Sequence, residues 1–258
     1  MRAVRFISEQ VLPPLVLLGA VLLAWELSVR QFEIPAYLLP GPRAVLAAAW
    51  RDAWQLLSAM RYTLQAAAGG FAISLVLGSL IAMAFAQSAL VRRAGYPYAV
   101  FLQTVPIVAI APLIIATCGQ SLRSVIVIAV TISLFPIITN VTAGLLAIDP
   151  KLAELFQVLQ ATRWQRLTKL QIPTAIPYAI TGARTSSGLA MVGAIVGEFF
   201  AGYGQQAYGL GYLIQANSDA LRTDKLFAAV LAAALLGVAI FGLVNGLALW
   251  LLRRWTQR

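Results

Sequence analysis

The sequence predicts an all-α membrane protein in which a single domain, residues 1–258, crosses the bilayer six times. Sixty per cent of the residues are apolar, and only 11% are charged, whereas a soluble domain carries about 25% charged residues. The apolar residues gather into six runs of about 20 residues or more, the length that spans a bilayer as a helix. This composition excludes an ordinary water-soluble enzyme and a disordered tail.

The first apolar run covers residues 11–29 and follows two arginines, Arg2 and Arg5. These flanks resemble those of a secretory signal peptide. The run is long, however, contains the pair Pro13 and Pro14, and lacks a cleavage site of small residues. We therefore expect it to be retained as the first span.

The next segment, residues 43–57, is too polar to span the bilayer. Apolar residues recur in it at helical spacing, with charged residues between them: Leu46, Trp50, Ala53, Trp54 and Leu57. Two tryptophans on one stripe are typical of a helix that lies at the outer lipid interface. A helix packed against other protein explains the same stripe equally well.

The remaining apolar runs cover residues 63–86, 98–117, 125–147, 173–201 and 226–252. Prolines interrupt three of them, and a proline frees a backbone carbonyl that lipid cannot satisfy: Pro106, Pro112, Pro136 and Pro177. Two glycine pairs have the GxxxG spacing that allows close helix contact, and we interpret them as packing positions: Gly193 with Gly197, and Gly242 with Gly246.

The net charge of +10 lies in the connections between apolar runs and forms no extended basic face, which argues against a nucleic-acid partner. Lys and Arg are more numerous on one side, so we expect both termini in the cytoplasm. That side holds Arg2, Arg5, Arg92, Arg93, Lys151, Arg163, Arg166, Lys169, Arg253, Arg254 and Arg258. The other side holds Arg30, Arg43, Arg51, Arg61, Arg123, Arg222 and Lys225.

No motif of catalysis or nucleotide binding is present. The chain has no histidine, no G-x-x-x-x-G-K-[ST] sequence and one cysteine, so it lacks the usual residues of a metal site, a catalytic triad or a phosphate-binding loop. We expect Cys118 to be a packing residue. These absences predict a protein that moves a solute without a cofactor, driven by an ion gradient or by a separate subunit.

The connection from Ile148 to Pro173 is too polar to span and too long for a turn. Asp149 followed by Pro150 is typical of a helix start. Four apolar residues then recur on one helical face: Leu152, Leu155, Phe156 and Leu159. This stripe is expected to be buried, either against the spans of the same chain or against a soluble partner.

Residues 154–200, ELFQVLQATRWQRLTKLQIPTAIPYAITGARTSSGLAMVGAIVGEFF, resemble the EAA region of permeases from binding-protein-dependent ABC importers. The resemblance is strongest to the nitrate, sulfonate, taurine and bicarbonate branch. Further segments resemble the same branch in the same order: LLPGPRAVL (38–46), QTVPIVAIAPLIIATCG (103–119), LFPIITNVTAGL (134–145) and YGLGYLI (208–214). The resemblance covers nearly the whole chain.

This resemblance implies the type I ABC importer permease fold, embedded in the lipid of a bacterial inner membrane. It also implies two cytoplasmic ATP-binding subunits, an extracytoplasmic solute-binding protein and a second copy of the permease as a homodimer. Residues 149–162 would be the coupling helix that sits in a groove of the ATPase. Its contact residues would be Leu152, Glu154, Leu155, Phe156, Leu159, Ala161 and Arg163. Gln160 stands where the family has glycine, and glutamine resists the left-handed backbone that glycine allows.

Two ionisable residues, Arg184 and Glu198, lie inside the fifth run. Such groups usually face a bundle interior and have a function. Fourteen residues correspond to about 21 Å of helix and return to nearly the same face. We expect this face to line the translocation path, together with Ser186, Ser187 and Met191.

Glu198 precedes a loop, residues 202–211, that holds four glycines and no charged residue. A carboxylate below such a loop can accept hydrogen bonds from its amides, so we expect Glu198 to hold an outer gate closed. The alternative is that Arg184 and Glu198 only anchor the loops at the two ends of the span.

Two rival functions remain open from the sequence. An ion-coupled secondary transporter needs intramembrane acids, and Glu198 is the serious candidate, but no internal repeat is visible. An assembly scaffold explains neither the broken spans nor the amphipathic hairpin. The transported solute is left open among nitrate, sulfonates, bicarbonate and vitamin-like heterocycles, as is the choice between homodimer and heterodimer.

Overall fold

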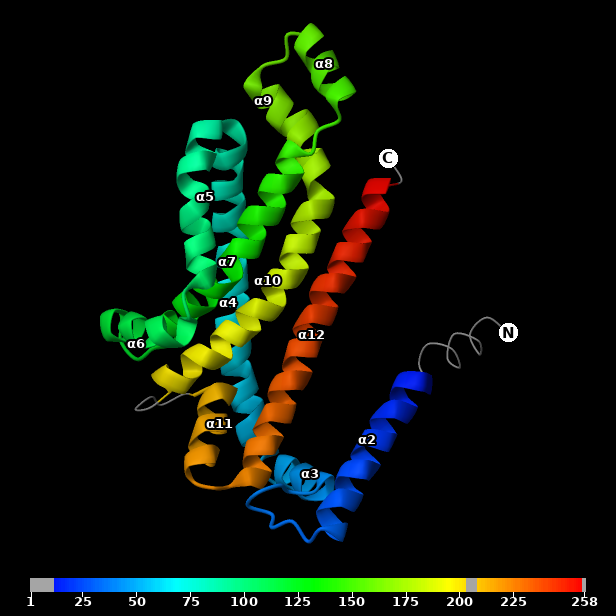
Figure 1. Cartoon of the computed structure of the whole chain (residues 1–258), viewed down its shortest axis with the longest axis vertical. Helices are drawn as coiled ribbons and strands as arrows, with labels where there is room; N and C mark the ends of the chain where they lie inside the picture. Colours follow the sequence, from blue (N-terminus) through cyan, green and yellow to red (C-terminus); the bar gives the residue numbers. More distant parts are fainter. Residues whose placement is uncertain (1–11, 203–207, 257–258) are drawn as a thin grey trace.

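The computed structural model describes residues 12–202 and 208–256. Within these ranges every regular element is helical, and most of the long helices lie side by side in one bundle (Figure 1). Five described helices are long and apolar enough to cross a bilayer, and one bent pair of helices is a sixth candidate. The predicted class, an all-α membrane protein, is therefore confirmed.

The described helices follow one another in this order: α2 (Leu12–Gln31), α3 (Pro42–Arg51), α4 (Ala53–Gln87), α5 (Ala89–Thr104), α6 (Ile107–Cys118), α7 (Leu122–Leu146), α8 (Pro150–Val158), α9 (Arg163–Arg166), the short π-helix η2 (Leu167–Gln171), α10 (Ile172–Ala201), α11 (Leu210–Asp219) and α12 (Thr223–Thr256). The candidate spans are α2, α4, the pair α5–α6, α7, α10 and α12. Arg2, Arg5 and Arg258, which contribute to the expected topology, lie outside the described residues.

The helix expected over residues 43–57 is divided between α3 and the start of α4. Asp52 separates them with a non-helical backbone (φ −101°, ψ 21°) and forms a 2.8 Å ion pair with Lys225 at the start of α12. Trp50 and Trp54 consequently lie on different helices, and both remain more than four-fifths exposed. The ion pair fastens the corner between α3 and α4 to α12.

α4 is much longer than the expected second run, with 35 residues. Its second part, residues 66–86, contains no charged residue and measures about 31 Å along the helix. That length matches the hydrocarbon core of a bilayer, about 30 Å. Residues 53–65 therefore extend beyond the core, at the end of the bundle that lies away from α8 (Figure 1).

The run expected as one span over residues 98–117 is broken into α5 and α6, which meet at 99°. Pro106 is the N-cap of α6, and Val105 before it is extended with ψ 126°. Proline has no N–H to donate and disfavours a helical residue before it, so α5 ends here. Pro112 and Pro136, by contrast, lie inside α6 and α7.

α7 packs closely between α4 and α10. A Cβ atom on Gly193 of α10 would lie 2.7 Å from the Cα of Ala129 in α7, so only glycine permits this approach. Hydroxyl groups join the same three helices: Ser74 Oγ lies 2.7 Å from Ser133 Oγ, and Ser186 Oγ donates to the Ser133 carbonyl at 2.6 Å. Close packing and interhelical hydrogen bonds are what hold helices together in lipid.

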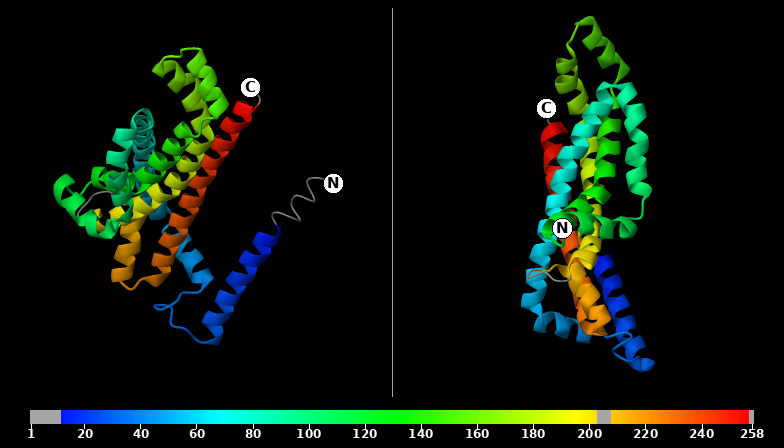
Figure 2. Two further views of the ribbon diagram at one scale, coloured as in Figure 1. Left: turned by 45° about the horizontal axis from the view of Figure 1, so that its top comes forward. Right: turned by 90° about the vertical axis from the view of Figure 1, so that its left-hand side faces the viewer.

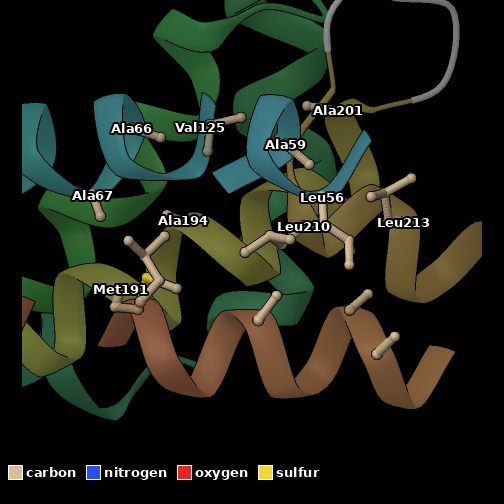
Figure 3. Close-up of a cluster of buried hydrophobic side chains, with 14 of the residues drawn as sticks. Leu56, Ala59, Ala66, Ala67, Val125, Met191, Ala194, Ala201, Leu210 and Leu213 are labelled. Carbon is tan, nitrogen blue, oxygen red and sulfur yellow. The ribbon is translucent and has the colours of Figure 1, made fainter. Parts of the chain in front are cut away.

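A second packing region lies toward the other end of the bundle, where α4, α10 and α11 converge on α12 (Figure 3). Leu56 and Ala59 of α4, Ala194 of α10, and Leu210 and Leu213 of α11 meet there. The short helix α11 is thus packed into the bundle by its apolar residues.

α2 stands apart from the bundle, as the left view of Figure 2 shows, and contributes no buried residue. It contacts the rest through its C-terminal part, where Trp25 lies 5.7 Å from the ring of Phe227 in α12.

Two residue-level expectations are corrected by the structure. Cys118, expected to pack, is exposed at the end of α6. Gly193 and Gly197 do pack against α7, but a Cβ atom on Gly242 or Gly246 would meet nothing within 4 Å. The second GxxxG pair therefore makes no close contact within the described chain.

The contact between α7 and α10 yields a first prediction. Gly193→Ala should lower the thermal unfolding midpoint of the detergent-solubilised protein, because the added methyl group meets the Ala129 backbone; overpacking of this kind costs about 1–3 kcal/mol. Gly188→Ala is the matched control, since a Cβ at that position of the same helix meets nothing within 4 Å. Equal midpoints for the two variants would contradict the described packing.

Candidate functional site

The connection between α7 and α10 projects beyond the spans as a hairpin of α8 and α9 (Figure 1). α8 begins at Pro150, and Asp149 Oδ1 accepts a hydrogen bond from the Lys151 N–H at 2.8 Å. α9 begins with a capping box in which Thr162 and Gln165 each bond the other's backbone N–H. α8 makes at most marginal contact with the other described helices, so the hairpin is formed by local interactions.

The apolar stripe of α8 is uncovered. Leu152, Leu155 and Leu159 are 45%, 50% and 66% exposed, and Phe156 is partly buried. Within the described chain, the stripe is therefore not folded back on the spans. Val158 and Trp164 add to the same exposed apolar surface. Val158 lies three residues after Leu155, so the helical spacing could have predicted that it belongs to the stripe. Trp164 lies in α9, to which the spacing in α8 does not extend.

Gln160 adopts the left-handed conformation that glycine usually supplies, with φ 48°. The Gln160 N–H donates to Gln157 O, and the Ala161 N–H donates to Phe156 O, each at 3.0 Å. Together these bonds form a Schellman motif, the usual end of a helix at a left-handed residue. The left-handed turn after α8 therefore forms although its residue is glutamine. The remaining expected contact residues, Glu154 and Arg163, are exposed.

The π-helix η2 fastens the hairpin to the bundle. Leu167 and Leu170 are buried, and the buried Gln171 accepts a hydrogen bond from Gln87 Nε2 at the end of α4, at 2.8 Å. α10 continues from η2 without a gap. The hairpin is therefore joined to α10 by continuous helix and to α4 by one side-chain hydrogen bond.

At the far end of α10, Glu198 is almost completely buried. Its Oε2 accepts hydrogen bonds from Thr63 Oγ1 of α4 at 3.0 Å and from the Gly211 N–H of α11 at 2.7 Å. Thr63 Oγ1 also accepts a bond from the Leu210 N–H at 2.9 Å. Glu198 therefore does meet an amide of the glycine-rich segment, while residues 203–207 of that segment lie outside the described residues.

Two glycines make room for this arrangement. A Cβ atom on Gly209 would overlap the Glu198 carboxyl group, and one on Gly211 would overlap the Ile195 carbonyl oxygen. Thr63 is the member of the site that sequence reasoning missed. Its signal was weak: Thr63 is one of two hydroxyl residues, with Ser74, on the otherwise apolar buried face of α4.

The α10 face expected to line the path lies inside the bundle. Ser186 and Ser187 are fully buried, and Met191 packs in the apolar cluster of Figure 3. Arg184 is partly buried, and its Nε has no hydrogen-bond partner among the described residues. Ser186, Ser187 and Met191 therefore face the interior of the bundle, while Arg184 remains partly exposed.

A mainly apolar hollow with three polar side chains, those of Gln103, Thr104 and Thr131, lies at the break between α5 and α6. This hollow of about 320 Å³ is lined by residues 102–107 together with Thr131, Ile132 and Leu189. The break lies eleven residues, or about 16 Å, beyond Arg93, which is about half of the bilayer core. Irregular backbone at such depth is tolerated where it is covered by protein or lines a water-filled cavity.

Comparison with known proteins places these features in a family context. Residues 74–257 match the family described as "binding-protein-dependent transport system inner membrane component". The formylaminopyrimidine transport permease protein ThiX of Halalkalibacterium halodurans is 32% identical over 93% of this chain and 94% of its own length. The riboflavin transport system permease protein RibX of Chloroflexus aurantiacus is 34% identical, over 93% of this chain and 88% of its own.

A solved structure shares the fold. The inward-facing MetNI methionine ABC transporter contains a chain that matches with a TM-score of 0.52, covering 81% of this chain and 98% of that one. The sequence identity is 19%, so the likeness concerns the arrangement of helices. More distant sequence relatives, at 25–28% identity, are named as permeases for aliphatic sulfonates, nitrate and bicarbonate.

The turn after α8 yields a second prediction. Gln160→Gly should strengthen the Schellman turn, because glycine avoids a left-handed penalty of roughly 1–2 kcal/mol, and Gln160→Val should weaken it, because β-branched residues rarely adopt positive φ. Hydrogen exchange at the Ala161 amide, measured by mass spectrometry, should be slower in the glycine variant and faster in the valine variant than in the native chain. Identical rates in all three proteins would contradict the assigned turn.

Proposed function

Because this chain belongs to the family of binding-protein-dependent transport system inner membrane components, we propose that it forms the path by which a small solute crosses the membrane. The chain is a permease subunit of an ABC importer, which sets aside the alternative of an ion-coupled secondary transporter. Permeases of this family are transport proteins without catalysis of their own. We accordingly assign ATP hydrolysis to separate subunits and solute delivery to an extracytoplasmic binding protein.

In the proposed assembly, two copies of the chain associate in a bacterial inner membrane with two cytoplasmic ATP-binding subunits. The hairpin end is cytoplasmic, as are both termini. The charge distribution supports this orientation, since the hairpin carries Lys151, Arg163, Arg166 and Lys169. A second copy is supported by the hollow at the α5–α6 break, because its polar residues Gln103 and Thr104 are exposed and one chain supplies only one wall.

The observation that carries the coupling role is the uncovered apolar stripe on an anchored hairpin. Burying a large apolar side chain stabilises a complex by roughly 1.5–3 kcal/mol, so Leu152, Leu155, Phe156 and Leu159 provide a strong contact for a groove on the ATPase. Glu154, Ala161 and Arg163 would border that contact. Through η2 and the bond between Gln171 and Gln87, movement of the ATPase would then reach both α10 and α4.

We place the solute path along the α5–α6 break, with Glu198 as a residue of the outer gate. The lining offers the amide of Gln103 and the hydroxyls of Thr104 and Thr131, with no charged side chain. Such uncharged amide and hydroxyl groups suit a neutral solute that hydrogen bonds. The relatives named for formylaminopyrimidine and riboflavin transport agree with this chemistry. We therefore propose a nitrogen heterocycle as the solute class.

The coupling proposal is tested with a pair of neighbouring substitutions. Phe156→Asp puts a charge into the apolar stripe and should reduce both ATP-dependent uptake and co-purification of the ATPase at least tenfold, while leaving the permease in the membrane. Gln157→Asp adds the same charge at an exposed residue beside the stripe and should leave both nearly unchanged. Full uptake with tightly bound ATPase in the Phe156→Asp variant would refute the coupling role of α8.

The path is tested by chemical accessibility. In a chain lacking Cys118, a cysteine at position 103 should react with a membrane-impermeant thiosulfonate, because water reaches the break. The control is Val76→Cys on the exposed apolar face of α4, which should not react. Riboflavin, delivered by the binding protein, should slow the reaction of the cysteine at position 103 with the thiosulfonate. Nitrate should leave the rate of that reaction unchanged. An unreactive cysteine at position 103 would move the path elsewhere.

A further inference from the structure

α11 begins without a cap of its own. Its N-cap residue is Gly209, which has no side chain to accept a hydrogen bond from the first amides of the helix. Two other helices supply the missing acceptors: Thr63 of α4 bonds the Leu210 N–H, and Glu198 of α10 bonds the Gly211 N–H. The start of α11 is therefore capped by side chains of two other helices of the same chain, α4 and α10.

The two capping side chains are also bonded to each other. Thr63 Oγ1 donates to Glu198 Oε2 at 3.0 Å, so one network joins α4, α10 and α11. Both side chains are buried. Each of the two side chains satisfies an N–H at the start of α11 that has no acceptor within the helix. The network therefore stabilises the docked position of α11.

The network is nonetheless incomplete. Glu198 Oε1 is buried and has no hydrogen-bond partner among the described residues. A buried acceptor without a donor costs free energy, so one unpaired oxygen atom opposes the hydrogen bonds of the docked state.

α11 itself is short enough to move as a unit. It has ten residues, and a helix of this length is marginal without tertiary contacts. Its other end is joined to α12 by a tight turn in which Leu221 has φ 54° and the Arg222 N–H donates to Asn217 O at 2.9 Å. That turn gives α11 a fixed end, while the capped end depends on α4 and α10.

We propose that α11 is the moving part of the outer gate. Thr63 of α4 and Glu198 of α10 hold it closed by capping its first turn. This inference rests on the proposed function, because the motion that α10 receives from the hairpin is what withdraws Glu198. α4 and α10 each carry half of the cap, so a relative shift of their outer ends breaks both bonds to α11. Gly209 and Gly211 are required because no side chain fits beneath the closed gate.

A reversible covalent tie tests whether α11 has to leave α4. Thr63 Oγ1 lies 2.9 Å from the Leu210 nitrogen, which brings the two Cα atoms into the range that a disulfide spans, about 4.4–6.8 Å. We expect Thr63→Cys with Leu210→Cys, in a chain lacking Cys118, to lose uptake on oxidation and regain it with dithiothreitol. The complete importer is used, with its ATPase and binding protein.

The reduced and oxidised forms separate the two proposals. ATP-dependent uptake by the reduced form supports the importer function independently of the gate. Undiminished uptake by the fully oxidised form would overturn the gate, because α4 and α11 would then never need to part. If the reduced form shows no uptake while the unsubstituted chain does, the two substitutions themselves have abolished transport. The single substitutions of Thr63 described next then decide whether the gate proposal holds.

Substitutions of Thr63 give the second measurement. Thr63→Val keeps the shape and removes the hydroxyl, which bonds both Glu198 and the Leu210 N–H. We therefore expect ATP hydrolysis without binding protein to rise at least about fivefold, the effect of losing two ordinary hydrogen bonds. Thr63→Ser keeps the hydroxyl and should behave as the native chain. A Thr63 with a structural role alone would lower the amount of assembled importer without raising hydrolysis per complex. Native hydrolysis in the Thr63→Val variant would therefore overturn the proposal.

Discussion

The close contact of α7 with α4 and α10 is the interaction on which the rest of this structure depends. In lipid, apolar surface gives no preference for one helix neighbour over another, so association relies on close backbone approach and hydrogen bonds. Gly193 against Ala129, and the serines at positions 74, 133 and 186, supply both. These contacts hold three spans together as one unit. The α8–α9 hairpin at one end and α11 at the other are therefore attached to the same packed helices.

α10 provides the physical connection between those two ends. It is continuous from Ile172 to Ala201, about 45 Å of helix, with the hairpin joined at its start and Glu198 in its last turn. α4 runs alongside it, bonded through Gln87 near the hairpin and through Thr63 near α11. The proposed coupling surface and the proposed gate therefore share the same two helices, and a separate relay is unnecessary.

Features set by local chemistry were predictable from the sequence, and features set by distant contacts were not. Hydrophobic runs indicated the membrane class, and the pair Asp149–Pro150 indicated where α8 begins. The 99° bend was not predictable, because Pro106 breaks a helix whereas Pro112 and Pro136 lie inside helices. The pairing of Thr63 with Glu198 joins residues 135 positions apart, and the helical period says nothing about such separations.

Gln160 shows that the left-handed backbone at the end of α8 is reached with a side chain present. Its positive φ and two hydrogen bonds form the Schellman turn in which glycine is the usual residue. A sequence pattern that requires glycine at this position selects the residue that adopts a positive φ most easily. Such a pattern overlooks chains that reach the same φ with a larger residue. Family membership in such cases is better judged by backbone geometry, together with the amphipathic stripe, than by the letter at one position.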